Sequence, residues 1–138
     1  MIIFCIFSTD FKIDLWSVAA ILPELRTSYP AFPGESGADQ LACISDVLGL
    51  PPASMYDRCT RKERYFDAAG VLQIAPSPRG MARLPNSRSL DMITNARRKD
   101  ADFVDFLARS LRWEPEARLR LEDCLSHPWL SEQTVQGT

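Results

Sequence analysis

The sequence predicts a mainly α-helical protein, and three observations carry this prediction. Apolar residues recur at helical spacing in several segments, whereas no segment shows the alternation typical of a strand. The length of 138 residues corresponds to one domain at most. A composition of 46% hydrophobic and 25% charged residues is that of a globular chain and excludes wholesale disorder. No apolar run approaches the roughly 18 residues of a membrane span, so we expect no membrane partner.

The first predicted helix covers about residues 11–27. Asp10 is suited to be its N-cap, because a carboxylate can accept hydrogen bonds from the free amides of a first turn. Pro23 conflicts with this helix, since an internal proline removes one hydrogen bond and costs about 3 kcal/mol. We therefore expect that the helix either kinks near residues 19–22 or ends early. The apolar residues at helical spacing are Ile13, Trp16, Ala20 and Leu25.

A turn-rich stretch follows, and residues 38–48 then predict a short amphipathic helix that Gly49 ends. Residues 51–97 hold five prolines and most of the arginines, and they show no sustained periodicity. A stretch of this length without secondary structure is usually functional, an insert or disordered. We interpret it as an irregular insert with one short helix near residues 54–65.

Regular structure is predicted to return at Asp100, which, like Asp102, is suited to cap a helix with an apolar stripe. A last helix is expected from about Leu121 to Ser126, and the polar tail at 131–138 is expected to fray. The predicted stripe consists of Phe103, Phe106, Leu107, Ser110 and Leu111.

The formal net charge of −2 is an average over three differently charged segments. Residues 1–57 carry two basic and seven acidic residues, residues 58–99 carry ten and three, and residues 100–138 carry four and eight. A basic segment therefore lies between two acidic ones.

The residues needed for catalysis or for metal binding are largely missing. The four cysteines, which form no CxxC pair, are interpreted as idle or buried thiols in a reducing compartment. His127 is the single histidine, and we interpret it as a structural residue at a helix end. No glycine-rich phosphate loop and no GxSxG motif occurs. We expect no catalytic residue, no cofactor and no metal ion in this chain. The cysteines are Cys5, Cys43, Cys59 and Cys124.

The basic segment allows two interpretations. Four cations near three aromatic residues could bind phosphates with base stacking, as in proteins that bind single-stranded nucleic acids. Alternatively, its arginines pair with the acidic flanking segments, and we favour this second interpretation because no nucleic-acid-binding motif is present. The residues concerned are Arg58, Arg61, Lys62 and Arg64, with Tyr56, Tyr65 and Phe66.

Several strings resemble the C-terminal lobe of a protein kinase. IDLWS at 13–17 resembles the start of the family's F helix, and PAFPGES at 30–36 resembles the turn that follows. DQLACISDVLGLPP at 39–52 resembles the G helix, and FVDFLARSLRWEPEARLRLEDCLSHPWL at 103–130 resembles helices H and I. The FPG and LGLPP strings and the long insert are similar to the CMGC group. The dual-specificity tyrosine-regulated (DYRK) branch is the most similar.

The resemblance implies an incomplete kinase lobe with helices F to I and a long insert at about 51–97. Such kinases use ATP and Mg²⁺ to phosphorylate Ser, Thr or Tyr of proteins, with a glycine-rich loop, a lysine, an HRD aspartate and a DFG aspartate. None of these motifs occurs in the sequence. The resemblance gives structural roles to Asp14, to Trp16 and to Arg118, whose usual glutamate partner is missing. We expect Arg118 to rotate to solvent, and Ile13, Trp16 and Ile21 to expose apolar surface on a marginally stable, aggregation-prone chain.

The expected organisation is a non-family segment at 1–10, a partial kinase domain at 11–130 and a polar tail at 131–138. The expected function is that of a kinase segment that is inactive alone, with protein substrates as partners of the parent. The alternative is a non-catalytic module that binds partners through helix G and the basic insert. Nucleic acid is not an expected partner, and the expected location is intracellular, either cytoplasmic or nuclear.

Overall fold

In a computed structural model, ten short helices form the described part of the chain, which comprises residues 11–74, 76, 79–80 and 82–135, with side chains to 131. The chain divides into two compact units. Among the described residues, the first unit comprises residues 32–89 and the second comprises residues 11–31 and 90–135. The mainly helical fold class is confirmed. The described residues include no β-strand, only an isolated bridge between Phe66 and Leu72.

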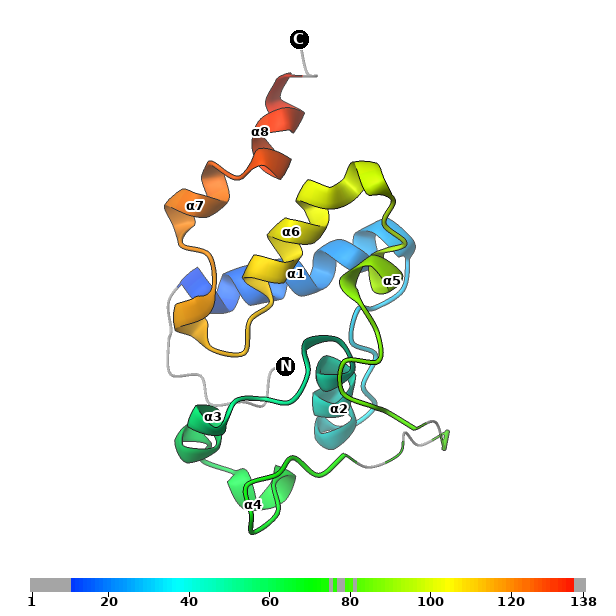
Figure 1. The fold of residues 1–138 in the computed structure, drawn as a ribbon, viewed down its shortest axis with the longest axis vertical. Helices are drawn as coiled ribbons and strands as arrows, with labels where there is room; N and C mark the ends of the chain where they lie inside the picture. Colours follow the sequence, from blue (N-terminus) through cyan, green and yellow to red (C-terminus); the bar gives the residue numbers. More distant parts are fainter. Residues whose placement is uncertain (1–10, 75, 77–78, 81, 136–138) are drawn as a thin grey trace. The chain divides into compact units, whose positions relative to one another are not determined.

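The first unit contains α2 (Gly37–Leu48), α3 (Ala53–Arg58) and α4 (Lys62–Tyr65) (Figure 1). Ser36 caps α2, since its Oγ accepts a hydrogen bond from Asp39 N at 3.1 Å. Gly49 ends α2 with a φ of 78°, a left-handed conformation that glycine adopts without strain, as predicted. The insert at 51–97 holds three short helices, α3, α4 and α5 (Leu90–Thr94), where the sequence predicted one.

The second unit is built around α1 (Phe11–Thr27), which continues through the buried Pro23 to Thr27. Of the two expected outcomes, a kink near residues 19–22 or an early end, the early end is excluded. The predicted N-cap, Asp10, lies outside the described residues. Both α5 (Leu90–Thr94) and α6 (Ala101–Ser110) pack against α1, and η1 (Arg98–Asp100) precedes α6. All five residues of the predicted apolar stripe of α6 are buried.

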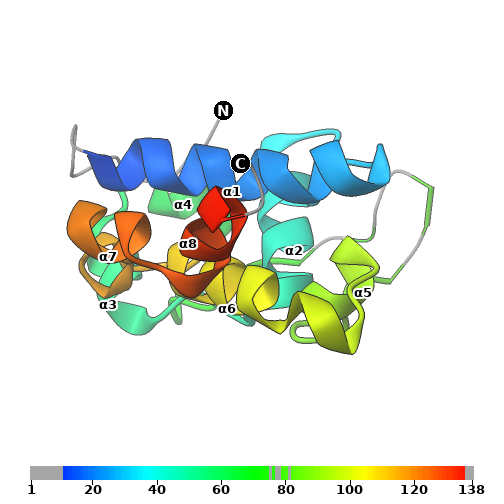
Figure 2. The same ribbon diagram turned by 90° about the horizontal axis from the view of Figure 1, so that it is seen from above.

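The C-terminal part of the second unit contains η2 (Pro115–Ala117), α7 (Leu121–Leu125) and α8 (Pro128–Val135). The prediction of a last helix from about 121 to 126 is confirmed by α7. The helix α8, which extends into the tail expected to fray, was not predicted. Figure 2 shows that α5, α6, α7 and α8 lie on one side of α1. This arrangement buries Leu15, Phe106, Leu119 and Cys124 in one cluster.

Candidate functional site

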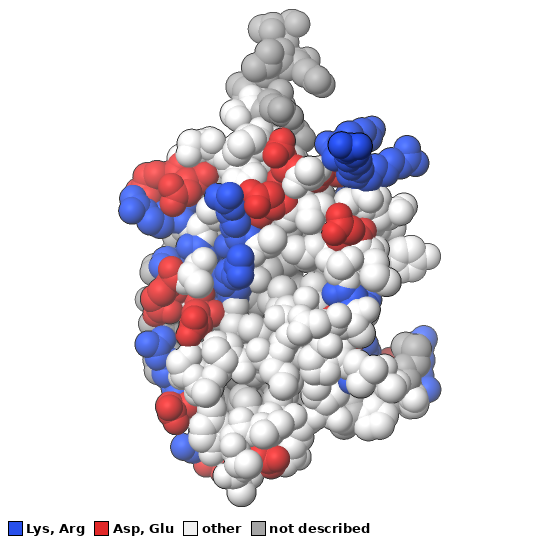
Figure 3. All heavy atoms as spheres, in the orientation of Figure 1, with Lys and Arg blue, Asp and Glu red and all other residues white. Residues whose placement is uncertain are grey.

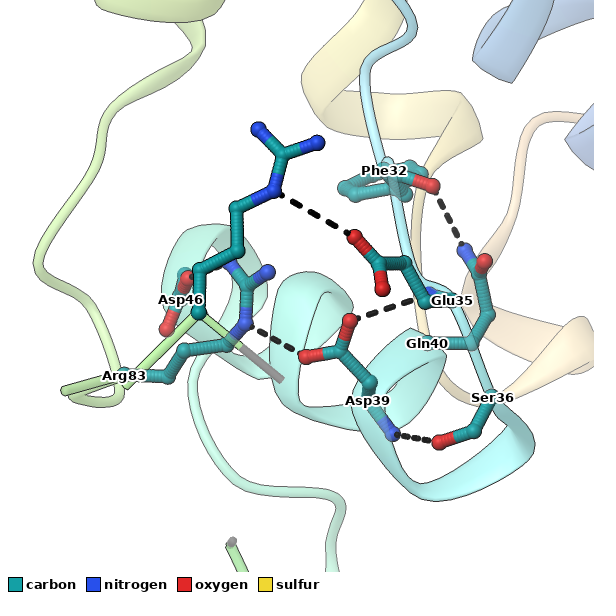
Figure 4. Close-up of polar contacts among 8 residues, drawn as sticks. Phe32, Glu35, Ser36, Asp39, Gln40, Asp46 and Arg83 are labelled. Atoms are coloured by element: carbon teal, nitrogen blue, oxygen red, sulfur yellow. Dashed lines mark hydrogen bonds and ion pairs between the residues drawn. The ribbon is translucent and has the colours of Figure 1, made fainter. Parts of the chain in front are cut away.

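A buried ion-pair cluster lies at α2 in the first unit (Figure 4). Arg83 Nε lies 2.8 Å from Asp39 Oδ1, and Arg83 Nη1 lies 3.3 Å from Asp46 Oδ2. The side chains of both aspartates are only 5% exposed, and that of Arg83 is 10% exposed. Asp46 Oδ1 has no hydrogen-bond partner among the described residues. The two aspartates are therefore held differently by the same guanidinium.

Helical geometry places these two carboxylates together. Asp39 and Asp46 are seven residues apart, which is about two helical turns, so both lie on one face of α2. Burial raises the pKa of Asp39, but a hydrogen bond from Glu35 N at 3.0 Å and the ion pair with Arg83 outweigh it. The pKa of Asp39 therefore lies below its usual value, and this carboxylate is ionised at neutral pH.

Backbone contacts fix the segment that follows Arg83 against the same helix. Asn86 N donates to Ser45 O at 3.0 Å, and Arg88 N donates to Asp46 O at 2.9 Å. This docking and the Arg83 ion pairs support the interpretation that the arginines of the insert pair with acidic flanking residues. We did not predict the Arg83 site from the sequence, although two aspartates at i and i+7 facing an arginine-rich insert were a usable signal.

Two further basic residues of the first unit lie over aromatic rings of the same unit. Lys62 Nζ lies 5.0 Å from the ring centroid of Tyr56, and the Arg64 guanidinium lies 5.7 Å from that of Tyr65. The first unit as a whole carries seven basic and six acidic residues, so the charge of the insert is nearly balanced within the unit.

Arg118 binds three backbone carbonyls of the second unit. Its Nη1 donates to Lys12 O at 2.9 Å, its Nε to Arg112 O at 2.9 Å, and its Nη2 to Trp113 O at 3.2 Å. The guanidinium also lies 4.7 Å from the ring centroid of Trp16, a cation–π distance. The expectation that Arg118 rotates to solvent was therefore wrong. Backbone carbonyls, which sequence reasoning did not consider, supply the acceptors.

The structure brings together two of the three residues that the resemblance singled out. Trp16 is 3% exposed and lies beneath Arg118, with the ring of Trp113 at 6.4 Å. The expectation of an exposed Trp16 was wrong, whereas Ile21 is 50% exposed as expected. Asp14 is exposed on α1 and is not a partner of Arg118.

His127 is a buried structural residue at the corner between α7 and α8. Its Nδ1 accepts a hydrogen bond from Trp129 N at 3.2 Å, and its Nε2 lies 3.0 Å from Asp105 Oδ2. Because Nδ1 accepts, Nε2 carries the proton that is donated to Asp105. The imidazole therefore caps the first turn of α8, and Pro128 takes the first helical position, which prolines favour. Both ring nitrogens are engaged in structural contacts.

The cysteines that the structure describes are buried, and two of them have a raised pKa. Burial raises the pKa of Cys43 to about 11 and also raises that of Cys124, so both thiols are protonated at neutral pH. Cys59 is buried as well, whereas Cys5 lies outside the described residues. In the part of the chain that the structure describes, no group of three His, Cys, Asp or Glu residues is placed to hold a metal ion. No helix among these residues is long and apolar enough to cross a membrane.

The chain is similar to protein kinases over most of its length. It is 42% identical over 123 residues to the human dual specificity tyrosine-phosphorylation-regulated kinase 4, a match that covers 89% of this chain and 23% of that protein. The DYRK-family kinase pom1 of Schizosaccharomyces pombe is 37% identical over 119 residues, which are 86% of this chain and 11% of that kinase. The dual specificity tyrosine-phosphorylation-regulated kinase 2 of Drosophila melanogaster is 40% identical over 118 residues, which are 86% of this chain and 16% of that kinase. The chain thus spans less than a quarter of each relative's length. No protein-family model matches it.

Proposed function

We propose that the chain is a segment of a kinase of the DYRK family and that residues 11–130 serve as the helical C-terminal lobe of this ATP-dependent protein kinase of the CMGC group. The parent transfers the γ-phosphoryl group of ATP to serine, threonine or tyrosine hydroxyls of intracellular proteins. The observation that carries this proposal is the identity of 37–42% to three DYRK kinases over about nine-tenths of the chain.

We also propose that the 138 residues alone transfer no phosphate. Phosphoryl transfer requires groups that position the γ-phosphate, hold Mg²⁺ and orient the accepting hydroxyl. The sequence contains no glycine-rich loop and no HRD or DFG motif. The contacts of Arg118, to which the resemblance gives a structural role, support the scaffold of the lobe rather than its chemistry, because Arg118 binds three backbone carbonyls.

A phosphotransfer assay tests this proposal. The purified chain is incubated with Mg²⁺, radiolabelled ATP and a generic protein substrate, and we expect no transfer above a blank without protein. The matched control is Leu107→Asp, which places a carboxylate at a fully buried position and unfolds the second unit. Transfer by the intact chain that Leu107→Asp abolishes would contradict the proposal, whereas equal transfer by both would reveal a contaminating kinase.

A second candidate function is a non-catalytic module that binds protein partners through α2 and the insert. The observation that favours it is the docking of residues 83–88 on α2, which gives the first unit a defined surface. Capture of a substrate of the parent kinase by the intact chain, lost in Arg83→Ala and retained in Arg112→Ala, would support this candidate. Equal capture by both variants would count against it.

A further inference from the structure

The corner between α7 and α8 depends on the neutral form of His127. A backbone N–H can only donate, so the hydrogen bond from Trp129 N at 3.2 Å requires an Nδ1 without a proton. Nε2 lies 3.0 Å from Asp105 Oδ2, and the side chain of His127 is only 3% exposed. Protonation of the ring would place a second N–H at Nδ1, opposite the N–H of Trp129. The protonated ring therefore cannot cap α8 in this arrangement.

The ion pair that a protonated His127 would gain is weak, because Asp105 is already paired. Arg109 Nε lies 3.0 Å from Asp105 Oδ2, the same oxygen that His127 Nε2 contacts. The side chain of Asp105 is 46% exposed, so solvent screens its attraction for a further cation. A protonated His127 would thus add a positive charge at a buried ring and share one carboxylate oxygen with an arginine. Burial of such a charge is unfavourable.

The other elements around the ring offer an imidazolium little compensation. Figure 3 shows acidic and basic side chains next to each other at the upper left, where Figure 1 places α7. Arg120 lies there 3.4 Å from Glu122 and 4.0 Å from Asp123, so these charges are balanced. The Cys124 thiol of α7 is protonated, since burial raises its pKa. The side chains of α8 at 128–131 are uncharged, and α1 contributes apolar side chains to the neighbouring cluster.

The helix that His127 caps covers aromatic side chains of α6. The ring centroid of Trp129 lies 5.1 Å from that of Phe103 and 4.9 Å from that of Phe106. We propose that protonation of His127 acts as a pH switch that releases α8 from α6 and exposes these three rings. The docked state binds fewer protons than the released state, so docking weakens as the pH falls. Histidine ordinarily changes its charge between about pH 5 and pH 8, which sets the range of the switch.

Hydrogen exchange of the full chain between pH 8 and pH 5.5 tests this proposal. Protection factors, corrected for the intrinsic exchange rate at each pH, are compared for the amides of α8 and of α6. We expect those of α8 to fall about fivefold on acidification, the effect of losing one helix cap, and those of α6 to change less than about twofold. The matched control is His127→Asn, because an asparagine side chain can cap the same amide but does not titrate. Its α8 protection should not depend on pH in this range.

Asp105→Asn tests the charge argument separately. The amide oxygen can still accept a hydrogen bond from His127 Nε2, but no carboxylate faces the protonated ring. The loss of α8 protection on acidification should therefore be larger than in the intact chain.

Three results would overturn the proposal. The first is an α8 protection that does not change with pH in the intact chain. The second is an equal loss in the intact chain and in His127→Asn, which would assign the effect to another group. The third is a smaller loss in Asp105→Asn than in the intact chain, which would show that the carboxylate rather than the cap governs the response. The switch does not depend on the proposed kinase function, and the phosphotransfer assay is separate, so each proposal can fail alone.

Discussion

Arg118 binds three carbonyl oxygens with three different nitrogen atoms, and this geometry depends on the planar guanidinium. A lysine keeps the charge but has a single nitrogen, which cannot reach the oxygens of Lys12, Arg112 and Trp113 together. We expect Arg118→Lys to lower the free energy of unfolding by about 1–3 kcal/mol, because carbonyls in this part-buried site lose their donors.

Urea unfolding followed by circular dichroism measures this effect. The control is Arg112→Lys, an exposed arginine for which we expect a change within about 0.5 kcal/mol. If the two variants were equally stable, the three carbonyl contacts of Arg118 would contribute nothing measurable.

Asp39 and Asp46 share one arginine but differ in how well they are satisfied. Asp39 has the shorter contact with Arg83 and a backbone donor, whereas Asp46 Oδ1 is buried without a partner. Breaking a buried ion pair is costly, so we expect Asp39→Asn to destabilise the first unit by about 3 kcal/mol. Asp46→Asn should cost less than about 1 kcal/mol, because it removes a charge that is poorly compensated. Hydrogen exchange of the amides of α2 in the two variants measures the difference.

The lowered pKa of Asp39 also predicts how stability depends on pH. In acid the unfolded chain takes up a proton at Asp39 before the folded chain does, so the unfolded state binds more protons and stability rises with pH. The contribution is complete above the ordinary aspartate pKa of about 3.9 and is lost as the pH falls through the lower folded value. Between pH 5 and pH 2, the protection factors of the α2 amides, which are corrected for the intrinsic exchange rate at each pH, should fall less in Asp39→Asn than in the intact chain. An identical acid response would contradict the assignment.

At the scale of the element, the turn before α2 depends on a close backbone approach at Gly34. A Cβ atom built there would lie 2.4 Å from Gln40 Cα and 2.5 Å from Gln40 N, so backbone must move. We expect Gly34→Ala to destabilise the first unit by about 1–3 kcal/mol, as overpacking does. The comparison is Gly80→Ala, where the space is open and only the positive φ of 73° adds strain. Thermal melts in which Gly80→Ala is the more destabilised would contradict this.

The elements that the sequence predicted are those whose own residues determine them. The stripe of α6 and the Gly49 stop of α2 are local signals, and both are confirmed. The helix α8 escaped prediction because its cap is an imidazole, which is not among the usual capping side chains, and because His127 is oriented by Asp105, 22 residues away. Local periodicity contains no information about such a partner.

The same limit explains why Arg118 was placed wrongly. Its acceptors are backbone carbonyls, one of them at Lys12, 106 residues earlier in the chain. Every residue has a carbonyl, so no sequence pattern marks the one that a distant arginine will find. The ion pairs of Arg83 could more easily have been predicted, because both acceptors are aspartates. The charges of the basic segment and of its acidic flanks already indicated that arginines of the insert pair with acidic residues.

At the scale of the whole molecule, the second unit is assembled from both ends of the chain. Arg26 reaches Thr94 and Asp100 across 68 and 74 residues, and Arg118 reaches Lys12 across 106 residues. Because these contacts enclose residues 32–89, the second unit can form only after a long loop has closed. Loop closure over such distances is slow, and apolar surface is exposed meanwhile.

One side of α1 exposes apolar side chains, which favours aggregation. Val18, Ile21 and Leu25 are 49%, 50% and 75% exposed and recur at helical spacing, while the other described helices of the second unit lie on the opposite side (Figure 2). Exposed apolar patches favour association, so we expect the isolated chain to aggregate. Ile21→Lys with Leu25→Lys should raise its solubility several-fold without loss of helicity, measured by light scattering and circular dichroism. Leu15→Lys, at a buried position, should unfold the chain instead. A monomeric wild-type chain that unfolds in one sharp transition above about 50 °C would contradict this expectation, because such behaviour belongs to intact domains with a fully covered core.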